Sequence, residues 1–190
     1  MRHPISMKNI VLSILTLLTS FSALAQKPSL PPSKVNFEAF LELAREVQEH
    51  RKNRVIHLKQ WIELSKKPNT IILDTRSKKM FDAKHIKGAV HLNFADFTME
   101  SLYRIARNKK TRILIYCNNN IDGNPVFFAS KAYIPTTPDE PKKTLALNVP
   151  TFINLYGYGY KNVYELADLV DANSGLLDFE GTRVTKPQKK

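Results

Sequence analysis

The chain of 190 residues contains one cysteine, and the residues around it favour sulfur chemistry. Cys117 ends an apolar run that begins at residue 112, and the polar loop Asn118-Asn119-Asn120-Ile121-Asp122-Gly123 follows at once. A buried strand that delivers one thiol to the mouth of a loop is a common way to present a nucleophile. Because Asn124 is a good helix N-cap and Pro125 suits the first helical position, we expect Cys117 to face the N-terminus of a helix that begins there. That setting would lower the pKa of the thiol and bind an anion attached to the sulfur.

Three further side chains have types that are used at catalytic sites. Asp74 and Arg76 follow the apolar run 70–73, and we expect this pair to hold the end of a strand together rather than to react. His85 is expected to support the turn at Gly88. The histidines, carboxylates and Cys117 do not have the spacing of metal ligands, so we expect no metal and no other cofactor.

The elements that would position these residues alternate between strands and helices. Short apolar, β-branched runs predict strands at 55–58, 70–73, 89–92, 112–117 and 162–166. Apolar residues at helical spacing predict helices over 36–47, 61–64, 97–105, 124–129 and 152–156. This alternation predicts an α/β domain with a small, mostly parallel sheet of about five strands, flanked by helices and preceded by an extra N-terminal helix. Ligands of such sheets bind at the carboxyl ends of the strands, where Asp74 and Cys117 are expected to lie.

The first 25 residues have the pattern of a targeting segment. Arg2 and Lys8 precede an apolar stretch that ends in Ser22-Ala23-Leu24-Ala25, which is typical of a secretory signal peptide cut after Ala25. The apolar stretch is too short for stable insertion across a membrane. We therefore expect a periplasmic or secreted protein.

The remaining chain is predicted to contain three parts and one insertion. We expect a linker and an amphipathic helix at 26–54, a folded domain at 55–170 and a partly disordered C-terminal extension at 171–190. Prolines interrupt the segment 134–147, which predicts a surface excursion that could form a lid.

The formal net charge is +12, which favours anionic partners. The lysines are scattered in short pairs along the chain, as on a solvated surface, and no nucleic-acid recognition motif accompanies them. We expect small anions rather than nucleic acid as ligands. A single cysteine also excludes an intramolecular disulfide.

Residues 55–170 resemble the rhodanese-like domain family in three segments. The stretch Leu73-Asp74-Thr75-Arg76-Ser77, with Phe81 and then His85-Ile86-Lys87-Gly88-Ala89 after it, resembles the family's "D-x-R, aromatic, G-H-I-x-G-A" signature. The strand Ile113-Leu114-Ile115-Tyr116-Cys117 is similar to the strand that carries the family's nucleophile. The stretch Gly159-Tyr160-Lys161-Asn162-Val163-Tyr164-Glu165-Leu166 resembles the closing "G-Y-x-N-V-x-x-L". The resemblance implies a small parallel sheet flanked by helices, with the cysteine loop around a pocket.

The activity that this resemblance implies is sulfane-sulfur transfer. Cys117 would attack a donor such as thiosulfate, become a persulfide and pass the outer sulfur to a thiol or to cyanide. The backbone of Asn118 to Gly123 would bind the anion. Family members that use thiosulfate commonly carry a basic residue in or near this loop, whereas this loop has no cation and contains Asp122. The related phosphatases need an arginine where Gly123 stands, so phosphatase activity is not expected.

Two other functions stay open at this point. The domain could be a catalytically weak module that binds a partner protein or a small anion through the same pocket. A thiol redox role is a third hypothesis, which would need an external thiol because the chain has no second cysteine.

Overall fold

The structure is a computed structural model that describes residues 30–141 and 143–184. The predicted signal peptide at 1–25 therefore lies outside the described residues, as does the end of the predicted C-terminal extension at 185–190. Residues 30–36 form no helix or strand, and the elements below belong to the unit that begins at Phe37.

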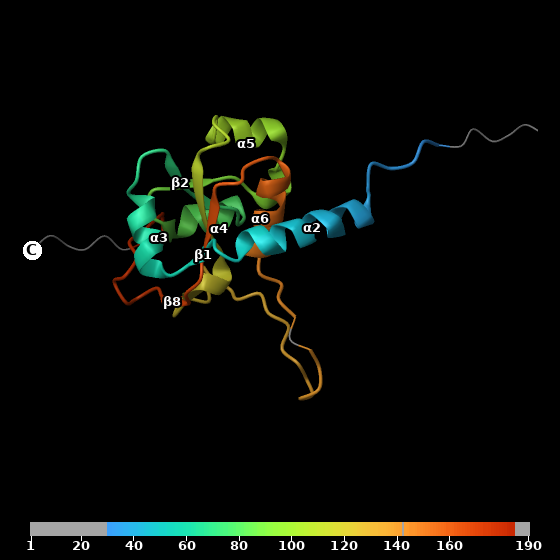
Figure 1. Cartoon of the computed structure of the whole chain (residues 1–190). Coiled ribbons are helices and arrows are strands. Elements are labelled where there is room, and N and C mark those ends of the chain that lie inside the picture. The colour runs from blue at the N-terminus through green and yellow to red at the C-terminus, as the bar shows by residue number, and fades with distance from the viewer. Residues whose placement is uncertain (1–29, 142, 185–190) are drawn as a thin grey trace, which may run out of the picture. The chain divides into compact units, whose positions relative to one another are not determined.

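A parallel sheet of five strands organises this unit, as predicted (Figure 1). The strands have the order β1-β7-β5-β2-β4, and every neighbouring pair is parallel. Their bounds are Val55–Ile56 for β1, Thr70–Asp74 for β2, Ala89–His91 for β4, Arg112–Tyr116 for β5 and Val163–Leu166 for β7. Since Asp74 pairs with Tyr116 in register, Cys117 leaves the sheet at its carboxyl edge, level with the residue after Asp74.

Helices cover both faces of the sheet, because the side chains of the central strand alternate between two apolar cores. Ile113 and Ile115 face the core on one side, and Leu114 and Tyr116 face the core on the other. The first core is covered by α2 (Phe37–Arg51), α5 (Met99–Ile105) and α6 (Asn148–Gly157). The second is covered by α3 (Leu58–Ser65), which lies on the other side of the strands from α2 and α6 (Figure 1). Trp61, on α3, is 1% exposed.

Small elements fill the edges. The bounds are Lys78–Ala83 for α4, His85–Ile86 for β3, Phe94–Asp96 for the 3₁₀ turn η1, Asn118–Asn120 for the 3₁₀ turn η2, Ile121–Asp122 for β6, Val170–Asp171 for β8 and Phe179–Glu180 for β9. The described part of the predicted C-terminal extension is structured, since β8 pairs with β6 and β9 pairs with β3.

One predicted helix is wrong. After Asn124 the chain makes a single turn, in which the N–H groups of Phe127 and Phe128 both donate to the Asn124 carbonyl at 3.2 and 2.9 Å. The turn does not continue as a helix, because the Phe127 carbonyl accepts from Arg76 while the Lys131 N–H, its helical donor, donates to Asn119 Oδ1. Phe128 is buried at 2% exposure in the second core, which holds the segment in place.

The predicted helix at 97–105 begins two residues later, at Met99. Thr98 is its N-cap, and its hydroxyl accepts from the Ser101 N–H at 3.0 Å while the Ser101 hydroxyl accepts from the Thr98 N–H at 2.9 Å. This reciprocal pair is a capping box, which excludes Phe97 from the helix.

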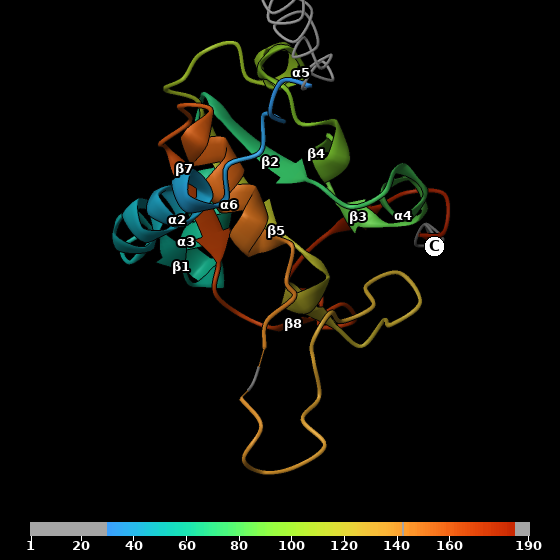
Figure 2. The ribbon, with the colours of Figure 1, turned by 90° about the vertical axis from the view of Figure 1, so that its right-hand side faces the viewer.

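The proline-rich segment forms an extended loop between η2 and α6, as predicted (Figures 1 and 2). An isolated antiparallel bridge joins Ala132 to Thr144 near its base. The two ends of the loop therefore lie close together, one beside the cysteine loop and one at the start of α6.

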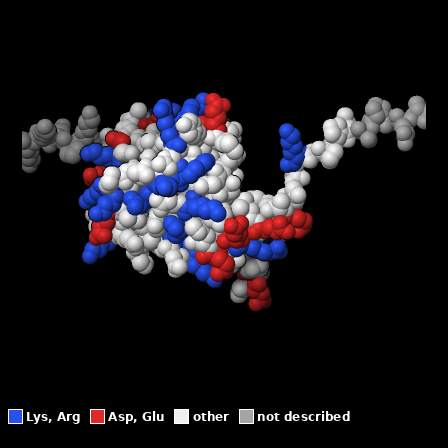
Figure 3. All heavy atoms as spheres, turned by 45° about the horizontal axis from the view of Figure 1, so that its top comes forward, with Lys and Arg blue, Asp and Glu red and all other residues white. Residues whose placement is uncertain are grey.

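Lysine and arginine side chains are spread over the surface rather than gathered in one block, as the face in Figure 3 shows. Within residues 30–141 and 143–184, no helix has both the length and the apolar character needed to cross a membrane.

Candidate active site

Cys117 directly follows β5 and lines a pocket of about 370 Å³. The residue is only 2% exposed. Segments from five parts of the chain surround the pocket. The lining residues are Thr75, Arg76, Ser77, Met80, Asn93, Phe94, Ala95, Cys117, Asn118, Asn119, Lys131 and Leu147.

The helix N-terminus beside Cys117 belongs to α6 and not to a helix at Asn124. Sγ accepts a hydrogen bond from the Asn119 N–H at 3.4 Å, and the backbone N–H groups of Leu147 and Asn148, at the start of α6, also act on the thiol. Because α6 has ten residues and its first N–H groups have no partner within the helix, this end attracts negative charge. The sequence analysis therefore expected a helix N-terminus beside Cys117 correctly, but it assigned this N-terminus to the wrong helix.

Burial raises the pKa of the Cys117 thiol above its ordinary value, which corrects the expectation of a lowered pKa. The loss of water around the thiolate is the largest effect, and the negative charge of Glu165 acts in the same direction. The N–H groups of Asn119, Asn148 and Leu147 oppose this shift without overcoming it. The resting thiol is consequently protonated at neutral pH.

The three asparagines after Cys117 have different surroundings. Asn118 and Asn119 line the pocket. The Asn119 side chain is fixed by a pair of hydrogen bonds to the backbone of Lys131, in which Nδ2 donates to the carbonyl at 2.8 Å and Oδ1 accepts from the N–H at 2.9 Å. Asn120 is buried, and its Oδ1 accepts from the Cys117 N–H at 3.0 Å. Asn120 thus supports the cysteine from the protein side.

The second half of the predicted binding loop leaves the pocket. Ile121 and Asp122 form β6, which pairs with β8. The Asp122 carboxylate accepts a hydrogen bond from the Gly123 N–H at 2.8 Å and is exposed. Together with Pro125 and Leu169, these three residues line a neighbouring cavity of about 310 Å³. Of the predicted loop, Asn118 and Asn119 are therefore the residues that share the pocket with Cys117.

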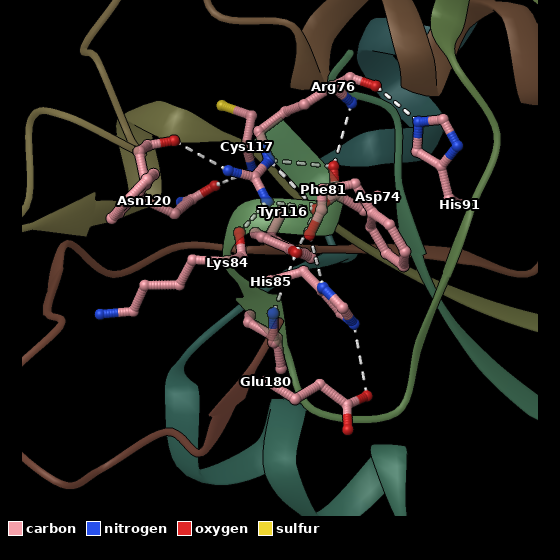
Figure 4. A network of polar contacts seen from close by, with 12 residues as sticks. Asp74, Arg76, Phe81, Lys84, His85, His91, Tyr116, Cys117, Asn120 and Glu180 are labelled. Atoms are coloured by element: carbon pink, nitrogen blue, oxygen red, sulfur yellow. Dashed lines mark hydrogen bonds and ion pairs between the residues drawn. The ribbon is translucent and has the colours of Figure 1, made fainter. Parts of the chain in front are cut away.

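Asp74, Arg76 and Tyr116 form a buried polar network beside the pocket (Figure 4). Arg76 Nη2 donates to Asp74 Oδ2 at 2.6 Å, and its Nε donates to both carboxylate oxygens at 3.0 and 3.1 Å. The Tyr116 hydroxyl donates to Asp74 Oδ2 and accepts from the Ile86 N–H at 3.2 Å. The network joins the ends of β2 and β5 to the backbone at Ile86.

The remaining donors of Arg76 reach two backbone carbonyls. Nη2 donates to the Lys84 carbonyl at 2.8 Å, and Nη1 donates to the Phe127 carbonyl at 3.0 Å. The guanidinium also lies 4.4 Å from the centroid of the Phe128 ring. Arg76 lines the pocket with its side chain. Because every guanidinium nitrogen already donates to the protein, the main role of this side chain is to connect β2 to the segment after the cysteine loop.

His85 is not among the residues that line the pocket, and it lies beside the turn at Gly88. Its Nδ1 donates to the Phe81 carbonyl at 2.6 Å, and its Nε2 lies 3.3 Å from Glu180 Oε1. The same carboxylate oxygen accepts from the Gly88 N–H at 2.8 Å. Glu180, on β9, therefore connects the histidine to the turn.

A second buried network runs from Cys117 to α2. Asn120 Oδ1 accepts from Asn148 Nδ2 at 2.8 Å, and Asn148 Nδ2 also donates to Glu165 Oε1 at 3.3 Å. Glu165 is 7% exposed and forms a two-point ion pair with Arg51, the last residue of α2.

Sequence reasoning missed Lys131, Leu147 and Asn148 at this site. All three lie at the ends of the proline-rich excursion, and no spacing pattern relates them to Cys117. Lys131 is the basic residue among these three, and it lines the pocket beside a cysteine loop that contains no cation. Within residues 30–141 and 143–184, no cluster of three or more histidine, cysteine or carboxylate side chains could hold a metal ion.

Three comparisons relate this chain to known proteins. A family model described as "Rhodanese-like domain" matches residues 57–168. The thiosulfate sulfurtransferase GlpE of Coxiella burnetii, in four strains, is 32% identical over 73 residues, which are 38% of this chain and 64% of the relative. The match thus spans less than two thirds of these curated relatives. Among solved structures, the BH2092 protein of Bacillus halodurans is 15% identical with a TM-score of 0.38, over 69% of this chain and 74% of that one.

Proposed function

This chain belongs to the rhodanese-like domain family, and from that premise we propose that it transfers sulfane sulfur through a persulfide on Cys117. The proposed donor is thiosulfate or a similar sulfur-containing anion, and the proposed acceptor is a thiol or cyanide. The observation that carries the proposal is the position of Cys117, which lines a pocket and lies beside the N-terminus of α6.

The proposed reaction has two balanced steps. The Cys117 thiolate attacks the outer sulfur of thiosulfate, the sulfur–sulfur bond of the donor breaks, and sulfite leaves with the electron pair. An acceptor nucleophile then attacks the outer sulfur of the persulfide. The second sulfur–sulfur bond breaks, the sulfur leaves on the acceptor, and the Cys117 thiolate is regenerated. No external oxidant or reductant is needed.

The backbone around Cys117 supports both anionic states of this cycle. The N–H groups of Asn119, Leu147 and Asn148 act on Sγ, and they would stabilise the negative charge of a thiolate or of a persulfide. Because these donors are fixed by η2 and α6, they do not have to reorganise during the reaction.

Lys131 is the proposed cation for the donor. It lines the pocket, and the hydrogen bonds between its backbone and the Asn119 side chain fix its main chain. We expect Lys131→Gln to raise the KM for thiosulfate about 3- to 30-fold, because the substitution removes one partly solvated charge contact with the donor. Lys59→Gln, at an exposed position on α3, removes the same charge away from the pocket and should leave KM unchanged.

Mass spectrometry and turnover together test the proposal. After incubation with thiosulfate, we expect a mass gain of about 32 Da, one sulfur atom, on Cys117. Thiosulfate:cyanide activity should accompany this adduct, and both should disappear in Cys117→Ser. Repeated absence of the adduct and of turnover would reject thiosulfate as the donor.

A partner-binding module of low activity is the second candidate. Two observations favour it: burial raises the pKa of Cys117, and all three guanidinium nitrogens of Arg76 already donate to the protein. This function predicts that Cys117→Ser binds the partner or a small anion as tightly as the wild type, without turnover.

The proposed location is the periplasm or the exterior of the cell, after cleavage behind Ala25. It rests on the sequence of residues 1–25 alone. N-terminal sequencing of the protein from an extracytoplasmic fraction should begin at Gln26, and an intact N-terminus in the cytoplasm would reject this location.

A further inference from the structure

Helix α2 precedes the region that the family model matches, yet it ends in contact with the buried interior of the domain. Its last residue, Arg51, donates from Nε to Glu165 Oε2 at 2.7 Å and from Nη2 to Oε1 at 2.8 Å. The Arg51 side chain is 32% exposed and that of Glu165 is 9% exposed. A carboxylate this buried is costly without a partner, and Arg51 is the cation that neutralises it.

Three hydrogen bonds connect Glu165 to the cysteine. Asn148 Nδ2 donates to Glu165 Oε1 at 3.3 Å and to Asn120 Oδ1 at 2.8 Å. Asn120 Oδ1 also accepts from the Cys117 N–H at 3.0 Å. Because Asn148 is the first residue of α6, the same side chain also fixes the helix end that faces Sγ.

We propose that α2 is part of the sulfur site, and that Arg51 is a positioning residue which neutralises Glu165 and thereby favours the thiolate form of Cys117. This inference rests on the proposed function for its biological meaning. Its test measures only the reactivity of the Cys117 thiol. The direction of the effect agrees with the negative charge of Glu165, which raises the pKa of Cys117.

Arg76, after β2, and Lys131, just before the proline-rich excursion, both line the pocket. Asp74, also beside the pocket, is held in its own buried ion pair with Arg76. Glu165 on β7 is therefore the carboxylate that opposes the thiolate within this set, and Arg51 is its ion-pair partner. Loss of the Arg51 charge leaves the opposing charge uncompensated.

The test is the pH profile of Cys117 alkylation by iodoacetamide, a reaction that needs no sulfur donor. We expect Arg51→Gln to slow alkylation about 3- to 10-fold at a fixed pH below the pKa of the thiol. Glu165→Gln should react faster than the wild type, and the double variant should react close to the wild-type rate. Arg51→Lys keeps the charge without the two-point geometry and should also react close to the wild-type rate. Arg45→Gln, an exposed arginine on the same helix, is the matched control.

The opposite signs of the two single variants separate this role from a merely structural one. If the ion pair only stabilised the fold, Arg51→Gln and Glu165→Gln would change alkylation in the same direction, and the double variant would not restore the rate. Either result would overturn the proposal. Should Arg51→Gln fail to fold, Glu165→Gln decides, because a slower reaction in that variant contradicts the inference.

A failure of the proposed function gives a different result. In that case the alkylation series keeps its order while thiosulfate leaves no sulfur adduct on any variant. If the inference alone fails, the adduct forms with Cys117, and the rates of Arg51→Gln and wild type coincide.

Discussion

Replacing Arg76 by methionine should destabilise the domain strongly, because it leaves a buried carboxylate without its cation. The side chains of Arg76 and Asp74 are 3% and 0% exposed. The substitution removes five hydrogen bonds, three of them to Asp74 and two to the carbonyls of Lys84 and Phe127. Asp74 keeps the Tyr116 hydroxyl and the main-chain N–H of residue 76.

The expected loss in the free energy of unfolding is about 3–5 kcal/mol, the usual cost of removing one partner of a buried ion pair. Solvent does not reduce this figure, because both groups are buried. A domain of this size is stable by about 5–15 kcal/mol, so Arg76→Met should still fold at room temperature with a much lower urea midpoint. The double variant Asp74→Asn/Arg76→Met should lose less than Arg76→Met alone, since it removes the unpaired charge together with its partner.

Urea unfolding followed by circular dichroism measures these differences, with an unchanged slope as the check that the transition stays two-state. Arg104→Gln is the control, because its ion pair with Glu100 on α5 is exposed and should leave the midpoint unchanged within error. A loss below about 1 kcal/mol in Arg76→Met would refute the reasoning. So would a double variant that is less stable than Arg76→Met.

Three further outcomes are expected. The rate of alkylation of wild-type Cys117 should rise with pH and have its midpoint above that of an exposed thiol, because the pKa of Cys117 is raised in the folded state. The contribution of Cys117 to the free energy of unfolding is therefore present below the unfolded-state pKa and is lost as pH rises through the folded-state pKa. Urea midpoints measured at several pH values can follow this loss. Asn120→Ala should lower the free energy of unfolding by about 1–3 kcal/mol, because the buried Cys117 N–H loses its acceptor; an unchanged urea midpoint would contradict this. Gly181→Ala should release β9 from β3, because φ of Gly181 is +136° and an added Cβ would lie 2.5 Å from the Ala83 carbonyl oxygen. Hydrogen exchange of the amides at 85–86 and 179–180 should then accelerate. Unchanged protection of these amides would argue against the close contact.

The sheet could be predicted because each of its strands is a short apolar run with its own boundaries. The runs that end at Asp74 and at Cys117 are buried on both faces, so their composition indicates a parallel sheet before any pairing is known. Cys117 was correctly expected at the carboxyl edge for the same reason.

The immediate surroundings of Cys117 could not be predicted, because they depend on contacts between distant segments. The pattern at Asn124 and Pro125 is a valid helix start, but Arg76 occupies the Phe127 carbonyl and limits the segment to one turn. The N–H groups that act on Sγ come instead from Leu147 and Asn148, after the excursion. The direction of the pKa shift was also missed, since it depends on burial rather than on the nearest helix.

The order of the strands has a consequence for the time course of folding. β5 is the central strand, and its neighbour β7 ends at Leu166, close to the end of the described chain. β1 reaches the sheet only through β7, since Val55 pairs with Glu165. Pairings between such distant residues form late, because the entropy of closing the loop must be overcome first. In a chain emerging from its N-terminus, the strand that leads to Cys117 therefore has only one of its two neighbours until β7 is available.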